Sequence, residues 1–146
     1  MARIQVSTVI NRPVEEVFGV LSNDENRPKW SSTTIDVKKT SEGPIGIGTT
    51  WRAVDRIFRR RIERESVFTE YEPNRKITQK STSGPVPFEV RLICEPVEGA
   101  TRVIVIAEAQ PSGFFKLAGP LFERLRKRQF ESDLADLKQG LEAHAF

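Results

Sequence analysis

The chain has 146 residues, of which 38% are hydrophobic and 29% are charged, with a formal net charge of +3. This length suits one domain, residues 1–146, with a substantial buried core, and the composition is that of a globular rather than a disordered protein. Its one cysteine, Cys94, excludes an internal disulfide and a cysteine-rich zinc site, while the short apolar runs and the lack of a signal peptide predict a cytoplasmic protein without integral membrane association.

The N-terminal residues predict one strand followed by two short helices. Hydrophobic and polar residues alternate over residues 3–10, which is typical of a strand. Asn11 can cap a helix, and apolar residues at helical spacing predict that helix over residues 13–22. The polar residues 23–30 form a turn or a second short helix that ends in Trp30.

Six strand-like segments follow, separated by short turns. They cover residues 33–39, 49–58, 60–71, 76–82, 88–95 and 101–110. Strands joined by short turns pair antiparallel, which excludes a doubly wound fold. In the first of these segments, the alternation predicts that Ile35 and Val37 share one face.

Alternation also predicts which faces of the last two strands are buried. In residues 88–95, we expect Phe88, Val90, Leu92 and Cys94 to face the C-terminal helix, and Glu89, Arg91 and Glu95 to face solvent. In residues 101–110, Val103, Val105, Ala107 and Ala109 share a face, but Ile104 and Ile106 on the other face are also apolar. The orientation of that strand therefore stays open.

Residues 112–146 predict one long amphipathic helix. Its apolar residues are Phe115, Ala118, Phe122, Leu125, Phe130, Leu134, Leu137 and Leu141. Such a helix must lie across the sheet, so we expect Phe122 to be buried between them. Arg126, Gln129 and Asp133 fall within the apolar arc. They point either into a polar part of a cavity or into water beyond the sheet edge.

Two basic clusters, residues 56–61 and 124–128, have two interpretations. They could contact nucleic acid or an anionic membrane. The interpretation that we favour is a solvated hairpin tip and a solvated helix face, each followed by acidic residues. No nucleic-acid motif accompanies either cluster, so we predict no nucleic-acid partner.

Several motifs along the chain resemble a known family. They are Ile10–Phe18, Asn26–Trp30, Gly46–Thr49, Glu70–Arg75 and Asp133–Lys138. Together they resemble the polyketide cyclase/dehydrase-like branch of the START/Bet v 1 superfamily (SRPBCC). The resemblance implies an α+β helix-grip fold, in which a seven-stranded curved antiparallel sheet wraps around the long C-terminal helix and encloses a pocket. The two short helices would lie between the first and second strands.

The sequence offers little for metal or nucleophilic chemistry. His144 is the only histidine and lies near the C-terminus, so no Ser-His-Asp triad or histidine metal site can form. We predict no cofactor and no metal. The candidate ligand-binding residues are Trp30, Trp51, Tyr71, Phe88, Val90, Leu92, Val105, Ala107, Phe122, Arg126, Gln129 and Asp133. An aromatic residue in a strand is more often plain core than ligand wall, although in a fold with a cavity the same residue can be both.

Three functions fit these observations. The first is binding of a hydrophobic small molecule, such as a lipid, a polyketide or an aromatic metabolite, by a monomer or homodimer. The second is a cofactor-independent cyclase or dehydratase that moves a proton with a buried ionisable residue. The third is an interaction protein with a basic surface. The absence of a usable histidine or triad favours the first.

Overall fold

The computed structural model describes residues 2–57, 59–110 and 114–146, without the side chains of residues 2, 114–120 and 122. The chain begins with β1 (Ala2–Ile10), α1 (Val14–Ser22) and the 3-10 helix η1 (Asp24–Lys29), and it ends with α2 (Phe114–Glu142). Between them lie β2 (Thr34–Lys39), β3 (Thr50–Ile57), β4 (Arg60–Glu72), β5 (Lys76–Ser83), β6 (Phe88–Val97) and β7 (Ala100–Ala109). This order agrees with the prediction.

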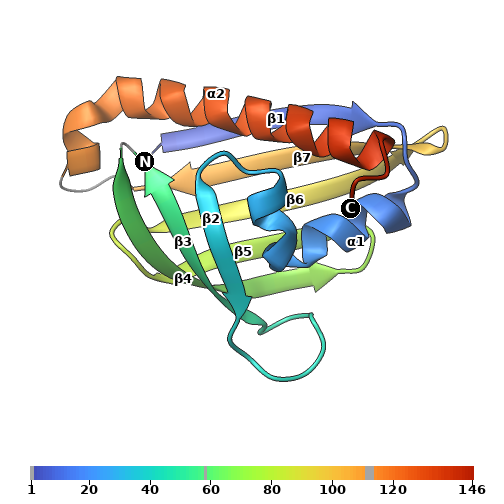
Figure 1. Cartoon of the computed structure of the whole chain (residues 1–146), viewed down its shortest axis with the longest axis horizontal. Coiled ribbons are helices and arrows are strands. Elements are labelled where there is room, and N and C mark those ends of the chain that lie inside the picture. The colour runs from blue at the N-terminus through green and yellow to red at the C-terminus, as the bar shows by residue number, and fades with distance from the viewer. Residues whose placement is uncertain (1, 58, 111–113) are drawn as a thin grey trace.

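The strands form one antiparallel sheet in the order β1-β7-β6-β5-β4-β3-β2. Figure 1 shows the curved sheet with α2 running along its β1 side and with α1 and η1 in front of its middle strands. Contacts of α2 with β1, of α1 with β6 and of η1 with β2 hold these layers together. The predicted α+β helix-grip arrangement is confirmed.

The predicted register of the last strands is also confirmed. On β6, Val90, Leu92 and Cys94 are buried, whereas the side chain of Arg91 is 42% exposed. The open question on β7 is settled in favour of the face that carries Val103, Val105 and Ala107, all of which are buried. The same core includes the side chains that α2 contributes, namely Phe130, Leu134, Leu137 and Leu141.

The prediction for β2 was wrong, because it placed Ile35 and Val37 on one face. Ile35 is 42% exposed and Val37 is buried. Thr34 pairs with Asp55 and Asp36 with Val54, so Ile35 is an extra residue with no partner across the strand pair. This bulge shifts the phase of the strand and turns both Thr34 and Val37 inward.

The prediction of Asn11 as a helix cap was also wrong. Pro13 occupies the N-cap of α1, and no side chain caps that helix. The backbone N–H of Asn11 instead donates to the carboxylate of Glu142, 2.8 Å away, and so ties the end of β1 to the end of α2. Side-chain capping occurs one helix later, where Asn23 accepts a hydrogen bond from the backbone N–H of Glu25.

Candidate functional site

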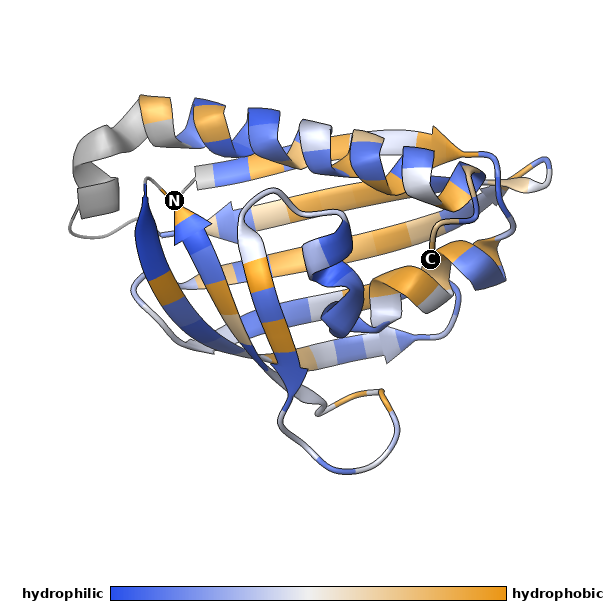
Figure 2. Cartoon of the chain, viewed as in Figure 1, coloured by the Kyte–Doolittle hydropathy of each residue, from blue (hydrophilic) through white to orange (hydrophobic). Residues whose placement is uncertain are grey.

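A cavity of about 90 Å3 lies between the concave face of the sheet, η1 and the middle of α2. One side is apolar and is formed by Ile4, Phe88, Val90, Ala107 and Phe130. The other side is polar and is formed chiefly by Arg27, Thr33, Thr34, Asp55, Arg64, Gln79, Arg126, Gln129 and Asp133. Figure 2 shows the same division along the sheet, since β6 and β7 are mostly hydrophobic whereas β4 and β5 are more polar.

One end of the cavity, here called the mouth, lies near the molecular surface. Ile57, Ile62, Pro85 and Glu123 line the mouth and are half-buried or exposed. Residues at the inner end, such as Gln79, are buried. This volume of about 90 Å3 is smaller than the roughly 300–1,000 Å3 of most small-molecule sites. The site is therefore present in this structure but small.

Asp55 and Arg64 form a buried ion pair on the polar side of the cavity. Asp55 follows Trp51 and Ala53 in the inward phase of β3, and Arg64 lies diagonally across on β4. Arg64 Nε is 2.6 Å from Asp55 Oδ2, and Thr34 Oγ1 donates to Asp55 Oδ1 at 2.8 Å. Burial alone raises the pKa of Asp55, but the charge and hydrogen bond of Arg64 and the bond from Thr34 lower it overall.

A second polar cluster lies where η1 meets the sheet. Arg27 Nε is 3.4 Å from Asp24 Oδ1, in an alignment too poor for a hydrogen bond, so this buried N–H has no acceptor within the described residues. Asp24 also accepts a hydrogen bond of 3.3 Å from Gln79 Nε2, which donates to Ser66 Oγ at 2.7 Å. The guanidinium of Arg27 lies over the ring of Trp30, 5.1 Å from its centroid.

Arg126 projects from α2 into the cavity. Its Nη1 donates to Gln129 Oε1 at 2.6 Å, and its guanidinium lies 5.1 Å from the centroid of the Phe130 ring. No carboxylate of the described residues lies within ion-pair distance of it, so it is a cation without a fixed anion in that part of the chain. Burial, reinforced by the charges of Arg27 and Arg64, lowers the pKa of Arg126 to about 10, although Asp55 and Asp133 act in the opposite direction.

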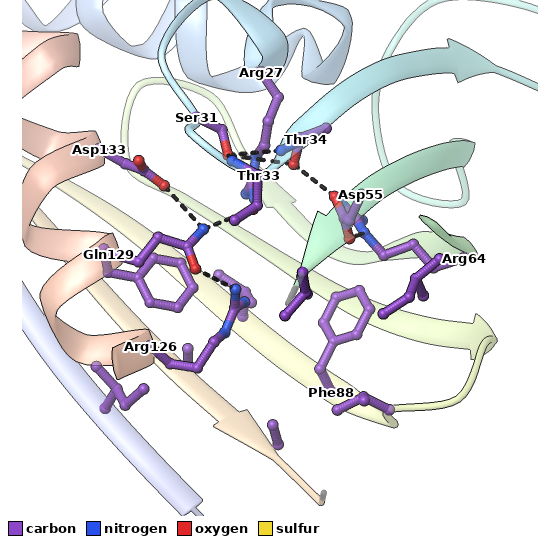
Figure 3. A pocket seen from close by; sticks show the side chains of 18 of the residues that line it. Arg27, Ser31, Thr33, Thr34, Asp55, Arg64, Phe88, Arg126, Gln129 and Asp133 are labelled. Atoms are coloured by element: carbon purple, nitrogen blue, oxygen red, sulfur yellow. Dashed lines mark hydrogen bonds and ion pairs between the residues drawn. The ribbon is translucent and has the colours of Figure 1, made fainter. Parts of the chain in front are cut away.

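Asp133 is the most deeply buried acid of the cavity, with 2% of its surface exposed. Its Oδ1 accepts the backbone N–H of Ser32 at 3.0 Å, and its Oδ2 lies 3.4 Å from Gln129 Nε2. Burial raises the pKa of Asp133, and the hydrogen bonds from Ser32 and Gln129 only partly offset this effect. Figure 3 shows Gln129 between Arg126 and Asp133, with its amide also directed at Thr33, to which it donates at 2.7 Å.

The structure brings together half of the ligand-binding residues predicted from the sequence. Those that line the cavity are Phe88, Val90, Ala107, Arg126, Gln129 and Asp133. Trp30, Trp51, Leu92 and Val105 are buried in the hydrophobic core, and Tyr71 packs against that core. The side chain of Phe122 lies outside the described residues. Of the two interpretations of the polar residues on α2, the structure supports a cavity-facing position, not an overhang into water.

Sequence reasoning missed most of the polar wall. Arg27, Thr34, Asp55, Arg64 and Gln79 were not among the predicted residues, yet all five line the cavity. The alternation of β3 did contain a signal, because a charged residue at the inward position after Trp51 and Ala53 is costly to bury without a function or a partner.

The described residues offer neither a metal-binding group nor a membrane-spanning helix. Their His, Cys, Asp and Glu side chains do not form a group of three or more that could hold a metal ion. In the same part of the chain, every helix is too short or too polar to cross a membrane.

The chain is similar to known proteins in its structure and in its sequence pattern. No curated protein matches the chain. Similar solved structures include a START superfamily protein from Mycobacterium smegmatis (TM-score 0.83, 14% identity, 100% of both chains covered). The Zhui aromatase/cyclase from Streptomyces sp. R1128 is also similar (TM-score 0.82, 14% identity, 99% of this chain and 95% of that chain). So is TTHA0849 from Thermus thermophilus (TM-score 0.82, 17% identity, 99% of both chains).

These structures share the fold at low identity, so they establish architecture alone. The family profile described as polyketide cyclase/dehydrase and lipid transport matches residues 1–142, nearly the whole sequence. The chain therefore belongs to the polyketide cyclase/dehydrase and lipid transport family.

Proposed function

We propose that this protein binds a small molecule that has an apolar, ring-containing body and one acidic group. The observation that carries the proposal is the cavity itself, which pairs an apolar side with Arg126, a cation without a carboxylate partner among the described residues. The apolar body would lie against β6, β7 and Phe130. The acidic group, a carboxylate or an enolate, would pair with Arg126.

The energetics of this arrangement are favourable for such a ligand. Apolar contact stabilises the complex by about 25 cal/mol per Å2 removed from water. Arg126 now makes one hydrogen bond to the neutral amide of Gln129, whereas a carboxylate would offer it an opposite charge and a bidentate acceptor. The guanidinium also keeps its charge when buried, since its pKa stays at about 10.

The present volume requires the cavity to enlarge when a ligand enters. A ring-containing molecule does not fit into about 90 Å3. The space can come from Arg126, which would leave Gln129 and turn toward the ligand, or from an outward movement of α2. An outward movement of α2 predicts that ligand binding changes the hydrogen exchange of its amides, whereas a turn of Arg126 alone leaves that exchange unchanged.

Competition between ligands tests the proposal. A hydrophobic fluorescent probe is titrated into the protein and displaced with matched pairs of aromatic compounds, one a carboxylic acid and the other its neutral amide. We expect the acid to displace the probe better than the amide, and Arg126→Leu to remove that preference. Arg124→Leu is the matched control, because Arg124 is exposed on the same helix. Absence of saturable probe binding would disprove the cavity as a binding site, and an unchanged preference in Arg126→Leu would disprove the role of the arginine.

Native mass spectrometry of the freshly purified protein complements the titration. It reports directly whether a small molecule accompanies the protein, and its mass identifies the compound class.

The buried carboxyl of Asp133 favours a second candidate function, acid–base catalysis of cyclisation or dehydration. A carboxyl whose pKa is raised by burial can take up a proton from carbon and return it to oxygen near neutral pH. Arg126 would stabilise the enolate formed between these two transfers. Incubation with a poly-β-keto thioester analogue, followed by mass spectrometry, would reveal the loss of water. Catalysis that survives in Asp133→Asn would exclude this role for Asp133.

A further inference from the structure

The outer face of α2 combines leucines with basic residues near the mouth of the cavity. At 100° per residue, Leu121, Arg124, Leu125 and Arg128 fall within an arc of about 100° on the side of the helix opposite Phe130. Leu121 is 57% exposed and Leu125 is 38% exposed, and both arginines are exposed. This face of the helix therefore combines two exposed apolar side chains with two exposed cations.

The basic tip of the β3–β4 hairpin lies at the same end of the molecule. Figure 1 shows this tip beside the N-terminal half of α2. The cavity lining supports the placement, because Ile57 and Ile62 from the hairpin and Glu123 from α2 bound the same mouth. Arg59, Arg60 and Arg61 at the tip are exposed. The two basic clusters of the sequence therefore flank one opening.

We call Arg59, Arg60, Arg61, Leu121, Arg124, Leu125, Lys127 and Arg128 the mouth surface. Three exposed glutamates of the described residues, Glu63, Glu123 and Glu131, belong to the same hairpin and helix segment, so the six basic side chains leave an excess of three positive charges. The whole chain has a net charge of +3. The positive charge of this protein is therefore concentrated at the entrance of its cavity, while the rest of the chain is close to neutral.

We propose that the mouth surface docks on an anionic lipid bilayer. Basic side chains at a membrane surface are each attracted by about 1 kcal/mol to anionic headgroups. Exposed leucines beside them gain by entering the boundary between headgroups and acyl chains. Nucleic acid would use the charges but gain little from the leucines, and the tests below separate a bilayer from an acidic protein. In this orientation the mouth of the cavity faces the bilayer, in which an apolar ligand dissolves.

The docking surface is separate from the ligand site proposed above. Its residues are exposed and lie outside the cavity lining. Membrane docking can thus be measured on the protein without ligand, and its failure would leave ligand binding untouched. The proposal also does not require a membrane-spanning element.

Vesicle co-sedimentation tests the proposal. The protein is mixed with phosphatidylcholine vesicles that contain either no phosphatidylglycerol or about a third of it. We expect partitioning onto the anionic vesicles to be at least about tenfold stronger, and to weaken as sodium chloride is raised, because salt screens exposed charges. Arg124→Glu/Arg128→Glu should lower partitioning by at least about tenfold, since two reversals remove more than about 1.4 kcal/mol.

Two matched controls separate the surface from general charge and hydrophobicity. Lys38→Glu/Arg102→Glu makes the same change in charge at exposed positions outside the mouth and should bind as the wild type does. Leu121→Ser/Leu125→Ser should lower partitioning by about tenfold without changing its salt dependence. Ile47→Ser, which removes a 71% exposed residue in the loop after β2, should have no effect.

Three results would overturn the proposal. Equal binding of the wild type to neutral and anionic vesicles would refute the electrostatic contact. Mouth variants that behave like their controls would place the contact elsewhere. Retention on a soluble polyanion such as polyglutamate or heparin, without vesicle binding and without an effect of the leucine variant, would assign the surface to an acidic protein or a nucleic acid instead.

Discussion

The buried pair of Asp55 and Arg64 allows the most direct test of the polar wall. We expect Arg64→Met, which keeps most of the aliphatic part of the side chain but removes its charge, to leave the carboxylate of Asp55 buried with only the hydroxyl of Thr34 as a close donor. Removing one partner of a buried ion pair costs about 3–5 kcal/mol. Urea unfolds a domain of this size with a slope of about 2 kcal/mol per M, so the midpoint should fall by about 2 M.

The same hairpin provides the control. Arg52 and Glu63 pair across β3 and β4 at 3.1 Å, but on the outer face, where their side chains are 56% and 59% exposed. Arg52→Met should therefore change the stability by less than about 1 kcal/mol. If the two arginine variants unfold at the same urea concentration, the pair in the cavity is not the buried, desolvated interaction described here.

Acid should reduce the difference between Arg64→Met and the wild type. The pKa of Asp55 is lowered in the folded protein, so its stabilising contribution is present above the unfolded pKa of about 3.9 and is lost as the pH falls. Without Arg64, burial dominates and raises the pKa, so the variant is relieved by protonation as the pH falls. A constant difference between pH values of about 7 and about 3 would contradict this.

Three other predictions concern burial. Because the pKa of Asp133 is raised in the folded state, wild-type stability falls as the pH rises through that pKa; Asp133→Asn should therefore be at least as stable as the wild type at neutral pH, with no advantage at about pH 3 in urea titrations. Leu137→Ala should cost about 2–5 kcal/mol in the same assay, whereas Leu121→Ala at the exposed face should cost less than about 0.5 kcal/mol. Burial raises the pKa of Cys94 to about 12, so iodoacetamide should alkylate it at mildly alkaline pH only after urea unfolds the protein; rapid labelling of the native protein would show that the thiol is accessible.

The order of the helices and strands could be predicted from local patterns, because each kind of element has its own hydrophobic period in the sequence. The alternation of Val90, Leu92 and Cys94 was sufficient to orient β6. The bulge at Ile35 was not foreseeable in this way, since an extra residue in a strand depends on its pairing with the neighbouring strand. Many local patterns along the chain indicate the same fold class, whereas a shift of register at one residue leaves no such pattern.

The site was predicted in part, and for a related reason. Helical spacing placed Arg126, Gln129 and Asp133 on the face that meets the sheet. Asp55 and Arg64 were missed because each is an ordinary charged residue of a strand when considered alone. Only the diagonal pairing across β3 and β4, together with the burial of both, reveals their role.

The C-terminal half of α2 is more deeply buried than the described residues before it. Among the described side chains of this helix, burial begins at Phe130 and continues through Leu134, Leu137 and Leu141, while those from 121 to 129 are exposed or half-buried. The segment from Phe130 back to Leu121 is about 13 Å long at a rise of 1.5 Å per residue, so a tilt of about 10° about Phe130 moves its far end by about 2 Å. This tilt also moves Arg126, because Arg126 lies within the same segment. A small rotation of α2 about Phe130 would therefore change both the width of the cavity and the position of the Arg126 guanidinium.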